Sequence, residues 1–212
     1  MVDDRIYWNK FYDKTHTNLQ EPSLFARFVY ENYLKDKKGA KLVEFGCGNG
    51  RDSLYFIKNG INVVGIDGSN VTIENLSKIA MGGGTSKFIC ADFTKNLDLE
   101  DFDFCYSRFT LHAINDCGEE ALFKNAAKIL KNDGLFFIEA RSINDGKFGF
   151  GKALGEREFI LDDHYRRFID KDILKNNLQK YNFNILKLEE SSEFAPIKGE
   201  NCVCLRAIVK LK

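Results

Sequence analysis

Three glycines alternate with other residues directly after a short apolar run. Residues 41–45 read KLVEF, and Gly46, Gly48 and Gly50 follow in the segment GCGNG, called here the glycine loop. Because glycine has no Cβ, it lets a backbone turn tightly and come close to a ligand. A loop of this kind after a strand predicts a small-ligand site. The dinucleotide pattern G-x-G-x-x-G is absent, however, because Arg51 stands where its third glycine would be.

Acidic residues accompany this loop and two further apolar runs. Glu44 lies two positions before the first glycine, where a carboxylate suits a cationic ligand better than a pyrophosphate. Asp67 ends the run VVGID and can accept hydrogen bonds from both hydroxyls of a ribose. Asp92 and Phe93 follow the run FICA, where they can bind an exocyclic amine and cover a purine face. Together these residues describe a nucleoside with a cationic tail that is not a phosphate.

Each of these signals has a simpler interpretation when it is taken alone. Aspartate favours junctions between strands and loops, so Asp67 and Asp92 could be turn formers. Gly50 could serve only the close packing of a helix on a strand. All of them fall at predicted strand ends in one chain, however, and this conjunction favours a ligand site over chance placement.

The elements that must position these residues alternate between strand and helix from residue 22 onward. Apolar runs predict strands at 41–47, 61–67, 87–92, 102–109, 135–142, 183–191 and 202–211. Amphipathic runs predict helices at 22–35, 51–60, 70–80, 119–134 and 170–182, the last with Asp170 as its N-cap. This order predicts an α/β fold with a doubly wound, parallel sheet and helices on both faces. The last two strands lack an intervening helix, which predicts an antiparallel hairpin at one edge.

With these features the chain resembles the class I S-adenosylmethionine-dependent methyltransferases, over about residues 40–140 and in outline throughout. The family's motif of an acidic residue and three alternating glycines is matched by Glu44 and the glycine loop. The resemblance implies that this loop cradles the methionine part, that Asp67 holds the ribose, and that Asp92 with Phe93 meets the adenine. The cofactor-binding residues expected in and around these strand ends are Glu44, Gly46, Cys47, Gly48, Gly50, Asp67, Gly68, Ser69, Asp92, Phe93, Ser107 and Arg108.

The same resemblance implies the overall organisation. We expect one domain over residues 1–212, built on a Rossmann-like, seven-stranded and mostly parallel sheet with helices on both faces. The cofactor would be S-adenosylmethionine and the spent product S-adenosylhomocysteine. Residues 1–38 would form a helical cap, and residues 143–168 an insertion on the substrate side.

The N-terminal segment RIYWNKFYDKTH contains aromatic residues at helical spacing. Such a stripe more often belongs to a core. In the family, however, a segment before the first strand often folds over the cofactor. We therefore expect Tyr7, Trp8 or Tyr12 to contact the cofactor, and Arg27 on the next helix to reach the methionine carboxylate.

Methyl transfer from a sulfonium is an in-line displacement, so acceptor alignment and water exclusion matter most. An alcohol or acid acceptor must also lose a proton, which a general base can remove. The segment from Ser107 to His112 should lie beside the methyl group, and His112 is either this base or a structural histidine. The motif Asn/Asp-Pro-Pro-Tyr/Phe is absent, which argues against a DNA adenine or protein glutamine methyltransferase.

The insertion at 143–168 is the second region with candidate residues. It contains four glycines, typical of a mobile lid, and a group of basic residues suited to a phosphate or carboxylate. The expected acceptor-binding residues are Arg141, His164, Tyr165, Arg166 and Arg167, with His164 as a second catalytic candidate. In an extended segment His164 and Arg166 would lie on one side. The alternative is a solvated loop whose arginines pair with its own carboxylates.

The patterns ARS, HYRRFI and EFAPIKGENCVCLRAIVK are also similar to methyltransferases of bacterial surface-polysaccharide clusters. That resemblance implies a small anionic acceptor, such as a sugar or a phosphorylated or phosphoramidate-type capsule precursor. Arg206, in the last predicted strand, would add a positive charge to the acceptor site. The alternative is that it is an ordinary charged residue of an edge strand without a role in the site. The alternatives are N-methylation of a small amine, detoxification of a thiol or metalloid, a non-catalytic cofactor-binding regulator, and a nicotinamide oxidoreductase.

The composition argues against some classes of binding partner. Lys and Arg total 31, as do Asp and Glu, so no overall charge attracts nucleic acid or a membrane surface. No apolar run approaches the roughly 20 residues that span a bilayer. The six cysteines have no zinc-type spacing, and we expect buried, reduced thiols at Cys47, Cys90, Cys105, Cys202 and Cys204. These features predict a cytoplasmic monomer or homodimer without a metal.

Overall fold

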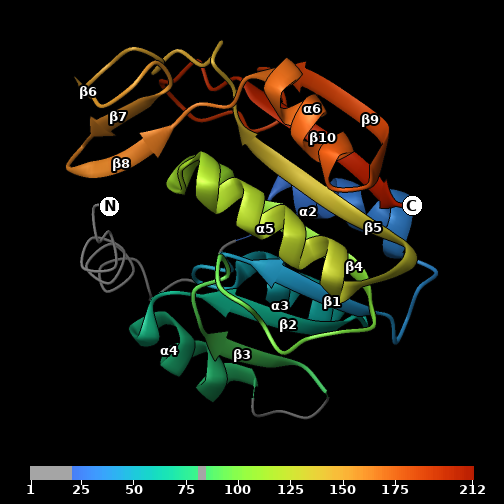
Figure 1. The fold of residues 1–212 in the computed structure, drawn as a ribbon. Coiled ribbons are helices and arrows are strands. Elements are labelled where there is room, and N and C mark those ends of the chain that lie inside the picture. The colour runs from blue at the N-terminus through green and yellow to red at the C-terminus, as the bar shows by residue number, and fades with distance from the viewer. Residues whose placement is uncertain (1–20, 81–84) are drawn as a thin grey trace.

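A seven-stranded sheet in the order β3-β2-β1-β4-β5-β10-β9 forms the centre of the computed structural model, which describes residues 21–80 and 85–212 (Figure 1). Its strands are β1 (Lys41–Phe45), β2 (Asn62–Asp67), β3 (Lys87–Cys90), β4 (Phe102–Arg108), β5 (Leu130–Arg141), β9 (Phe183–Ser191) and β10 (Cys204–Leu211). Strands β1 to β5 pair in parallel, whereas β10 runs antiparallel to both β5 and β9. The Rossmann-like sheet and its antiparallel terminal hairpin are confirmed.

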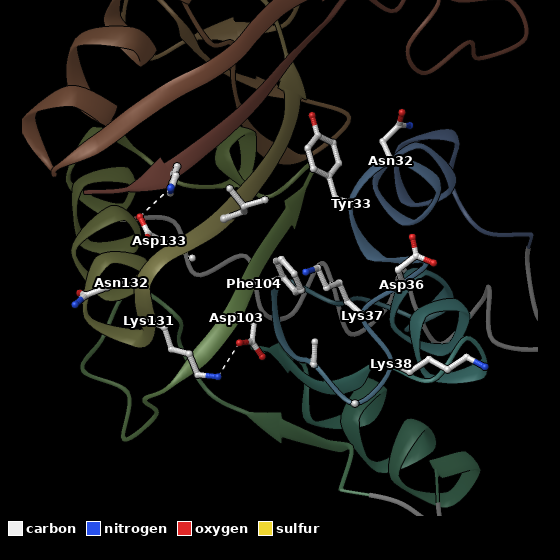
Figure 2. Close-up of a pocket in the computed structure, with 15 residues that line it drawn as sticks. Asn32, Tyr33, Asp36, Lys37, Lys38, Asp103, Phe104, Lys131, Asn132 and Asp133 are labelled. Atoms are coloured by element: carbon white, nitrogen blue, oxygen red, sulfur yellow. Dashed lines mark hydrogen bonds and ion pairs between the residues drawn. The ribbon is translucent and has the colours of Figure 1, made fainter.

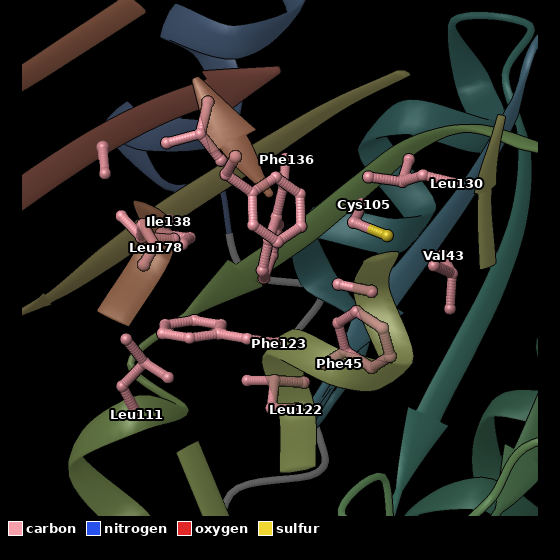
Figure 3. Packing of buried hydrophobic residues seen from close by; sticks show 14 of the residues in the cluster. Val43, Phe45, Cys105, Leu111, Leu122, Phe123, Leu130, Phe136, Ile138 and Leu178 are labelled. Carbon is pink, nitrogen blue, oxygen red and sulfur yellow. The ribbon is translucent and has the colours of Figure 1, made fainter. Parts of the chain in front are cut away.

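Helices cover both faces of this sheet. They are α2 (Leu24–Val29), a π-helical turn at Tyr30–Leu34, α3 (Arg51–Lys58), α4 (Asn70–Ala80), α5 (Asp116–Ile129) and α6 (Lys171–Lys180). The α5–α6 face packs on the larger apolar cluster, part of which is seen in Figure 3. Helices α2 and α3 pack on the opposite face. The predicted N-cap at Asp170 is confirmed, since its carboxylate accepts the N–H groups of Asp172 and Ile173.

Alternation along β4 sends its side chains into two layers. Cys105 belongs to the α5 side, whereas its neighbours Phe104 and Tyr106 belong to the α2–α3 side. A strand covered on both faces is apolar nearly throughout, which is why its sequence gives a clear signal. The layers hold the strand ends, and therefore the residues beyond them, in fixed relative positions.

Helix α5 ends five residues before the predicted position. Its last residue is Ile129, and Leu130 already pairs with Phe102 at the start of β5. Asp133 adopts a left-handed conformation (φ 66°) beside Gly134 within the segment assigned to β5. The Asp-Gly pair therefore marks a turn inside the strand segment, because burial of Leu130 against the sheet ends the helix earlier.

The segment after β5 contains a second, three-stranded antiparallel sheet, formed by β6 (Lys152–Ala153), β7 (Glu158–Leu161) and β8 (His164–Arg167). Phe148, Phe159 and Phe168 pack edge to face beneath it. Part of the predicted loop is thus an ordered layer with its own small core. Among the described helices, none is long and apolar enough to cross a membrane.

Three expectations about single side chains need correction. Leu24, an apolar residue of the amphipathic helix predicted at 22–35, is 52% exposed rather than buried. Cys90 is exposed, although the other four named cysteines are buried. Arg206 is buried and lies on β10, which is an interior strand between β5 and β9. The edge-strand interpretation of Arg206 is therefore wrong, because β9 occupies the outer position.

Candidate active site

The candidate site lies where the strand order reverses. From β1 the chain winds outward through β2 and β3 in one direction and through β4 and β5 in the other. Crevices at the carboxyl ends of strands beside such a switch point are the usual ligand sites of open α/β sheets. The glycine loop, Asp67, Asp92 and the end of β4 all follow carboxyl ends of these strands.

The glycine loop is forced into its shape by its neighbours. Gly46 has φ 69°, and a Cβ on it would lie 2.7 Å from Oγ1 of Thr110. Thr110 cannot easily move, because its hydroxyl donates to the carbonyl of Phe45 at 2.8 Å. Gly50 has φ 74°, and a Cβ on it would collide with Leu76 of α4. Helix packing thus explains Gly50, as the simpler interpretation proposed, whereas Gly46 is held against the end of β4.

Asp67 connects the glycine loop to the end of β2. Its Oδ2 accepts the Gly48 N–H, and its Oδ1 accepts the Ser69 N–H, both at 2.9 Å. Among the residues that the structure describes, none lies within 4 Å of the position a Cβ would take on Gly68. Burial raises the pKa of the Asp67 carboxyl, and the backbone hydrogen bonds partly oppose that shift. The carboxylate is thus oriented, beside open space, with lone pairs left for a ribose diol.

Glu44 lies deeper than expected. It is 4% exposed and accepts a hydrogen bond from the hydroxyl of Ser53 on α3. Burial, and then the neighbouring Asp52 carboxylate, raise the pKa of Glu44 well above its ordinary value. Its contact with a cationic ligand remains a prediction, since its hydrogen-bond partner Ser53 belongs to the helix behind the loop.

Asp92 and Phe93 occupy the end of β3 with different exposure. Asp92 is exposed, and one carboxylate oxygen accepts both the N–H and the hydroxyl of Thr94. Phe93 packs against Phe45, with ring centroids 6.4 Å apart. Asp92 therefore stabilises a turn, as the simpler interpretation proposed. A hydrogen bond from an adenine amine to Asp92 would have to be accepted by its other carboxylate oxygen.

Two polar networks on the α2–α3 face carry no sequence motif and were not anticipated. Asp52 accepts hydrogen bonds from the N–H and hydroxyl of Ser23 and from the hydroxyl of Tyr106, at 2.7–2.8 Å. Glu139 is fully buried, and its two oxygens bind Arg108 at 2.9 Å and Arg206 at 2.6 Å. Their partners are 29 to 67 residues apart in the chain, so only the fold brings them together.

The end of β4 carries further candidates. Ser107 is fully buried, and its hydroxyl finds no partner within the described part of the chain. Arg108 stacks on Phe109, with its guanidinium carbon 4.0 Å from the ring centroid. Both are where the sequence placed them, beside the glycine loop through the pairing of Phe45 with Ser107.

His112, Arg166 and His164 form one cluster. Arg166 lies between the two imidazoles, 3.3 Å from Nε2 of His112 and 2.6 Å from Nε2 of His164. His164 and Arg166 thus share one side of β8, as alternation predicted. Burial, and next the Arg166 charge, lower the pKa of His112 well below its ordinary value. A neutral His112 that accepts from Arg166 carries its proton on Nδ1, which has no partner among the described residues.

Two other arginines expected to bind the acceptor are tied to protein carboxylates. Arg141 binds Asp145 and Glu200, and only 6% of its side chain is exposed. Arg167 is completely buried and binds Asp116, Glu119 and the carbonyl of Leu111. Arg167 is thus committed to the fold, which corrects its assignment to the acceptor.

The remaining candidates lie at the margins. Tyr165 is partly buried on β8, and burial raises its pKa. Arg27 is half exposed on α2 and pairs with Glu21, so its contact with the cofactor stays a prediction. Tyr7, Trp8 and Tyr12 lie outside the described residues.

Two cavities in the described part of the chain bear on the location of the site. One of about 830 Å³ lies at the amino ends of β1 and β4, and two of its lysines form ion pairs with lining aspartates, Lys131 with Asp103 and Lys210 with Asp133 (Figure 2). This is the opposite edge from the glycine loop. The other, of about 340 Å³, is lined by Ser23, Leu24, Arg51, Arg108, Phe109, Phe194, Ala195, Pro196 and Ile197. It lies at the carboxyl end of β4, beside the candidate site.

Comparisons with a family model and with known proteins agree on one family. The sequence matches the family model described as a methyltransferase domain over residues 17–188. It is 25% identical to the carboxy-S-adenosyl-L-methionine synthase of Nautilia profundicola over 200 residues, covering 88% of this chain and 81% of that protein. It is 27% identical to the ubiquinone biosynthesis O-methyltransferase of Pelagibacter ubique over 180 residues, covering 77% and 73% respectively.

Solved structures agree on the fold. The Burkholderia thailandensis 1,6-didemethyltoxoflavin-N1-methyltransferase, crystallised with its substrate and S-adenosylhomocysteine, superposes with a TM-score of 0.74. The superposition covers 98% of this chain and 87% of that one at 15% identity.

Proposed function

Because the chain belongs to the class I S-adenosylmethionine-dependent methyltransferases, we propose that it transfers a methyl group to an oxygen of a small anionic acceptor. S-adenosylmethionine supplies the methyl group on a positively charged sulfur. The single observation that carries the proposal is the arrangement at the switch point, where Asp67 binds Gly48 of the glycine loop and no described residue lies within 4 Å of a Cβ built on the adjacent Gly68.

The residues present fit this cofactor. Asp67 offers an oriented carboxylate for a ribose, and the glycine loop brings backbone rather than side chains to the crevice. The buried hydroxyl of Ser107 supplies a polar group at the end of β4. Glu44 would support the loop from beneath through its hydrogen bond with Ser53 rather than through an exposed contact with the cofactor.

The cluster of His112, Arg166 and His164 supports an anionic acceptor. Arg166 contacts both imidazoles through its guanidinium and brings a positive charge to this cluster. Its guanidinium can bind a phosphate or carboxylate with two parallel hydrogen bonds. The depressed pKa of His112 keeps its imidazole neutral, as a general base must be, although Nε2 must leave Arg166 before it can accept a proton.

The acceptor class we propose is a sugar or a phosphorylated or phosphoramidate-type precursor of a surface polysaccharide. The resemblance of the segments around Arg141, Tyr165 and Arg206 to methyltransferases of such clusters supports this choice. The named relatives act on dissimilar acceptors, so the acceptor must be identified by turnover.

The test is methyl transfer from isotopically labelled S-adenosylmethionine to a panel of phosphorylated sugars and their unphosphorylated counterparts. We expect product only with the anionic members, and Arg166→Gln should raise KM about ten-fold or more while cofactor affinity is retained. Lys152→Gln, which removes an exposed charge from β6 of the same small sheet, serves as the control. Equal turnover of neutral and anionic acceptors would contradict the proposal.

A further inference from the structure

The cavity of about 340 Å³ at the end of β4 has a charged floor and apolar walls. Arg51 and Arg108 supply the charge, and no acidic residue is among its described lining residues. The walls are Leu24 at the start of α2, Phe109 after β4, and residues 194–197 of the loop between β9 and β10. Leu24 and Ile197 are 52% and 36% exposed, although both are large and apolar. A volume of this size suits a small molecule.

The positive charge on the floor exceeds its local compensation. Arg108 and Arg206 share the single carboxylate of Glu139, which leaves one net positive charge in this group. Arg206 cannot reorient easily, because it also donates to the carbonyl of Phe194 and stacks on that ring. The desolvated Arg108 is held cationic by Glu139, while 16% of its side chain stays exposed.

Arg51 is similarly placed but less constrained. Its nearest carboxylate is Asp52, with Nε 3.5 Å from Oδ1, and that carboxylate already accepts three shorter hydrogen bonds from Ser23 and Tyr106. About a quarter of the Arg51 side chain is exposed, at 27%. Its guanidinium therefore has donors available to a ligand in the cavity.

We propose that this cavity is a second anion-binding subsite of the acceptor cleft, which takes a carboxylate or phosphate carried on a short apolar segment. The anion binds Arg51 and Arg108, and the apolar segment lies against Leu24, Phe194 and Ile197. The subsite borders the cluster of the proposed reaction, because Phe109 lines the cavity and its ring centroid is 5.1 Å from that of His112. It rests on the proposed function and narrows its acceptor to an amphiphilic anion.

Binding can be tested without knowing the acceptor. Benzoate serves as the anion on an apolar segment, benzamide as its neutral counterpart, and acetate as the anion without the apolar segment. Their dissociation constants are measured by NMR titration of the full chain with and without S-adenosylhomocysteine. We expect benzoate to bind about ten-fold more tightly than either of the others, as loss of a charge-assisted hydrogen bond or of apolar burial predicts.

Variants then locate the binding. Arg51→Gln should weaken benzoate about ten-fold while sparing benzamide, and Ile197→Asp, a partly exposed position, should weaken both. Lys38→Gln removes a charge at the opposite edge of the sheet and should change neither. Thermal unfolding of each variant shows whether the fold is kept.

Three results would overturn the proposal: equal binding of benzoate and benzamide, equal binding of acetate and benzoate, or an Arg51→Gln variant that loses S-adenosylhomocysteine as strongly as benzoate. The last would assign the cavity to the carboxylate of the cofactor itself. A protein that binds benzoate as expected but never S-adenosylhomocysteine would refute the proposed function and leave the anion subsite intact.

Discussion

At the scale of single residues, His112 shows how the fold changes the pKa of a side chain. Its residue type alone did not distinguish a general base from a structural histidine. It is 4% exposed, packs on Phe109, and has Arg166 at its Nε2. Burial first, and the Arg166 charge second, disfavour its protonated form, so its pKa lies well below 6.5 in the folded state. The unfolded chain has no such environment and would protonate this imidazole at an ordinary pKa.

The first prediction concerns pH. Between the ordinary pKa of about 6.5 and the lower folded value, the unfolded state binds the extra proton, so the free energy of unfolding falls as pH decreases through this window. This contribution is fully present above about pH 6.5. NMR titration of the His112 ring should show it still neutral at about pH 6, with Arg166→Gln raising its pKa. A titration midpoint near 6.5 in the native protein would refute this account.

A second residue-scale prediction separates two reasons for glycine. Gly39→Ala introduces a side chain at φ 82° with no residue of the described ranges 21–80 and 85–212 within 4 Å, whereas Gly46→Ala adds a clash with Thr110 to a similar φ. We expect Gly39→Ala to cost about 1 kcal/mol of unfolding free energy and Gly46→Ala about 1–3 kcal/mol more, measured by urea unfolding. Equal decreases in unfolding free energy for the two variants would mean that the Thr110 side chain moves aside without an energetic penalty.

The sequence pattern predicted the candidate residues that lie at strand ends. It did not predict the contacts between residues that are far apart in the chain. Gly46 and Asp67 follow apolar runs, so their positions were readable from local pattern. Glu139 sits inside the run LFFIEA without any spacing signal, and its partners Arg108 and Arg206 come from two other strands. Only the register of β4, β5 and β10 brings the three together.

At the scale of elements, Arg167 fastens the small sheet to helix α5. It belongs to β8, and its guanidinium binds Asp116 and Glu119 in the first turn of α5. Arg167 thus pairs with another element, rather than with carboxylates of the insertion as the solvated-loop interpretation supposed. Arg157 makes a more exposed contact with the same Asp116, which offers a matched comparison.

We predict that Arg167→Gln lowers the free energy of unfolding by about 3–5 kcal/mol, because it leaves buried Glu119 without its ion partner. Arg157→Gln should cost about 1 kcal/mol or less, since Asp116 is 54% exposed. Urea unfolding gives both values, and hydrogen exchange should show faster opening of β7 and β8 in Arg167→Gln alone. Equal free energies of unfolding for the two variants would show that Arg167 does not stabilise the fold more than Arg157 does. Arg167 would then again be a candidate for binding the acceptor.

The order of elements was predictable, but some of their ends were not. Strands apolar on both sides gave β1, β2, β4 and β5 directly. The end of α5 was misplaced because Leu130 is drawn into the sheet by tertiary packing, which local propensity does not register. The small sheet was missed because its strands are two to four residues long and rich in charge.

At the scale of the whole molecule, the winding of the sheet places its functional groups. Residues separated by more than 60 positions meet at one edge because parallel strands bring their carboxyl ends together, as with Phe45 and Thr110. The larger cavity lies at the other edge, so cavity size alone would point away from the chemistry. The topology identifies the carboxyl edge as the site.

The most direct test is calorimetric titration of S-adenosylhomocysteine into the protein, into Asp67→Ala, and into the control Asp98→Ala, whose side chain is exposed outside the crevice. We predict binding by the parent and the control, and about ten-fold or greater weakening in Asp67→Ala from the lost ribose hydrogen bonds. Unchanged affinity in Asp67→Ala, or a parent protein that binds NADH and not S-adenosylhomocysteine, would contradict the assignment of this crevice to an adenosyl cofactor.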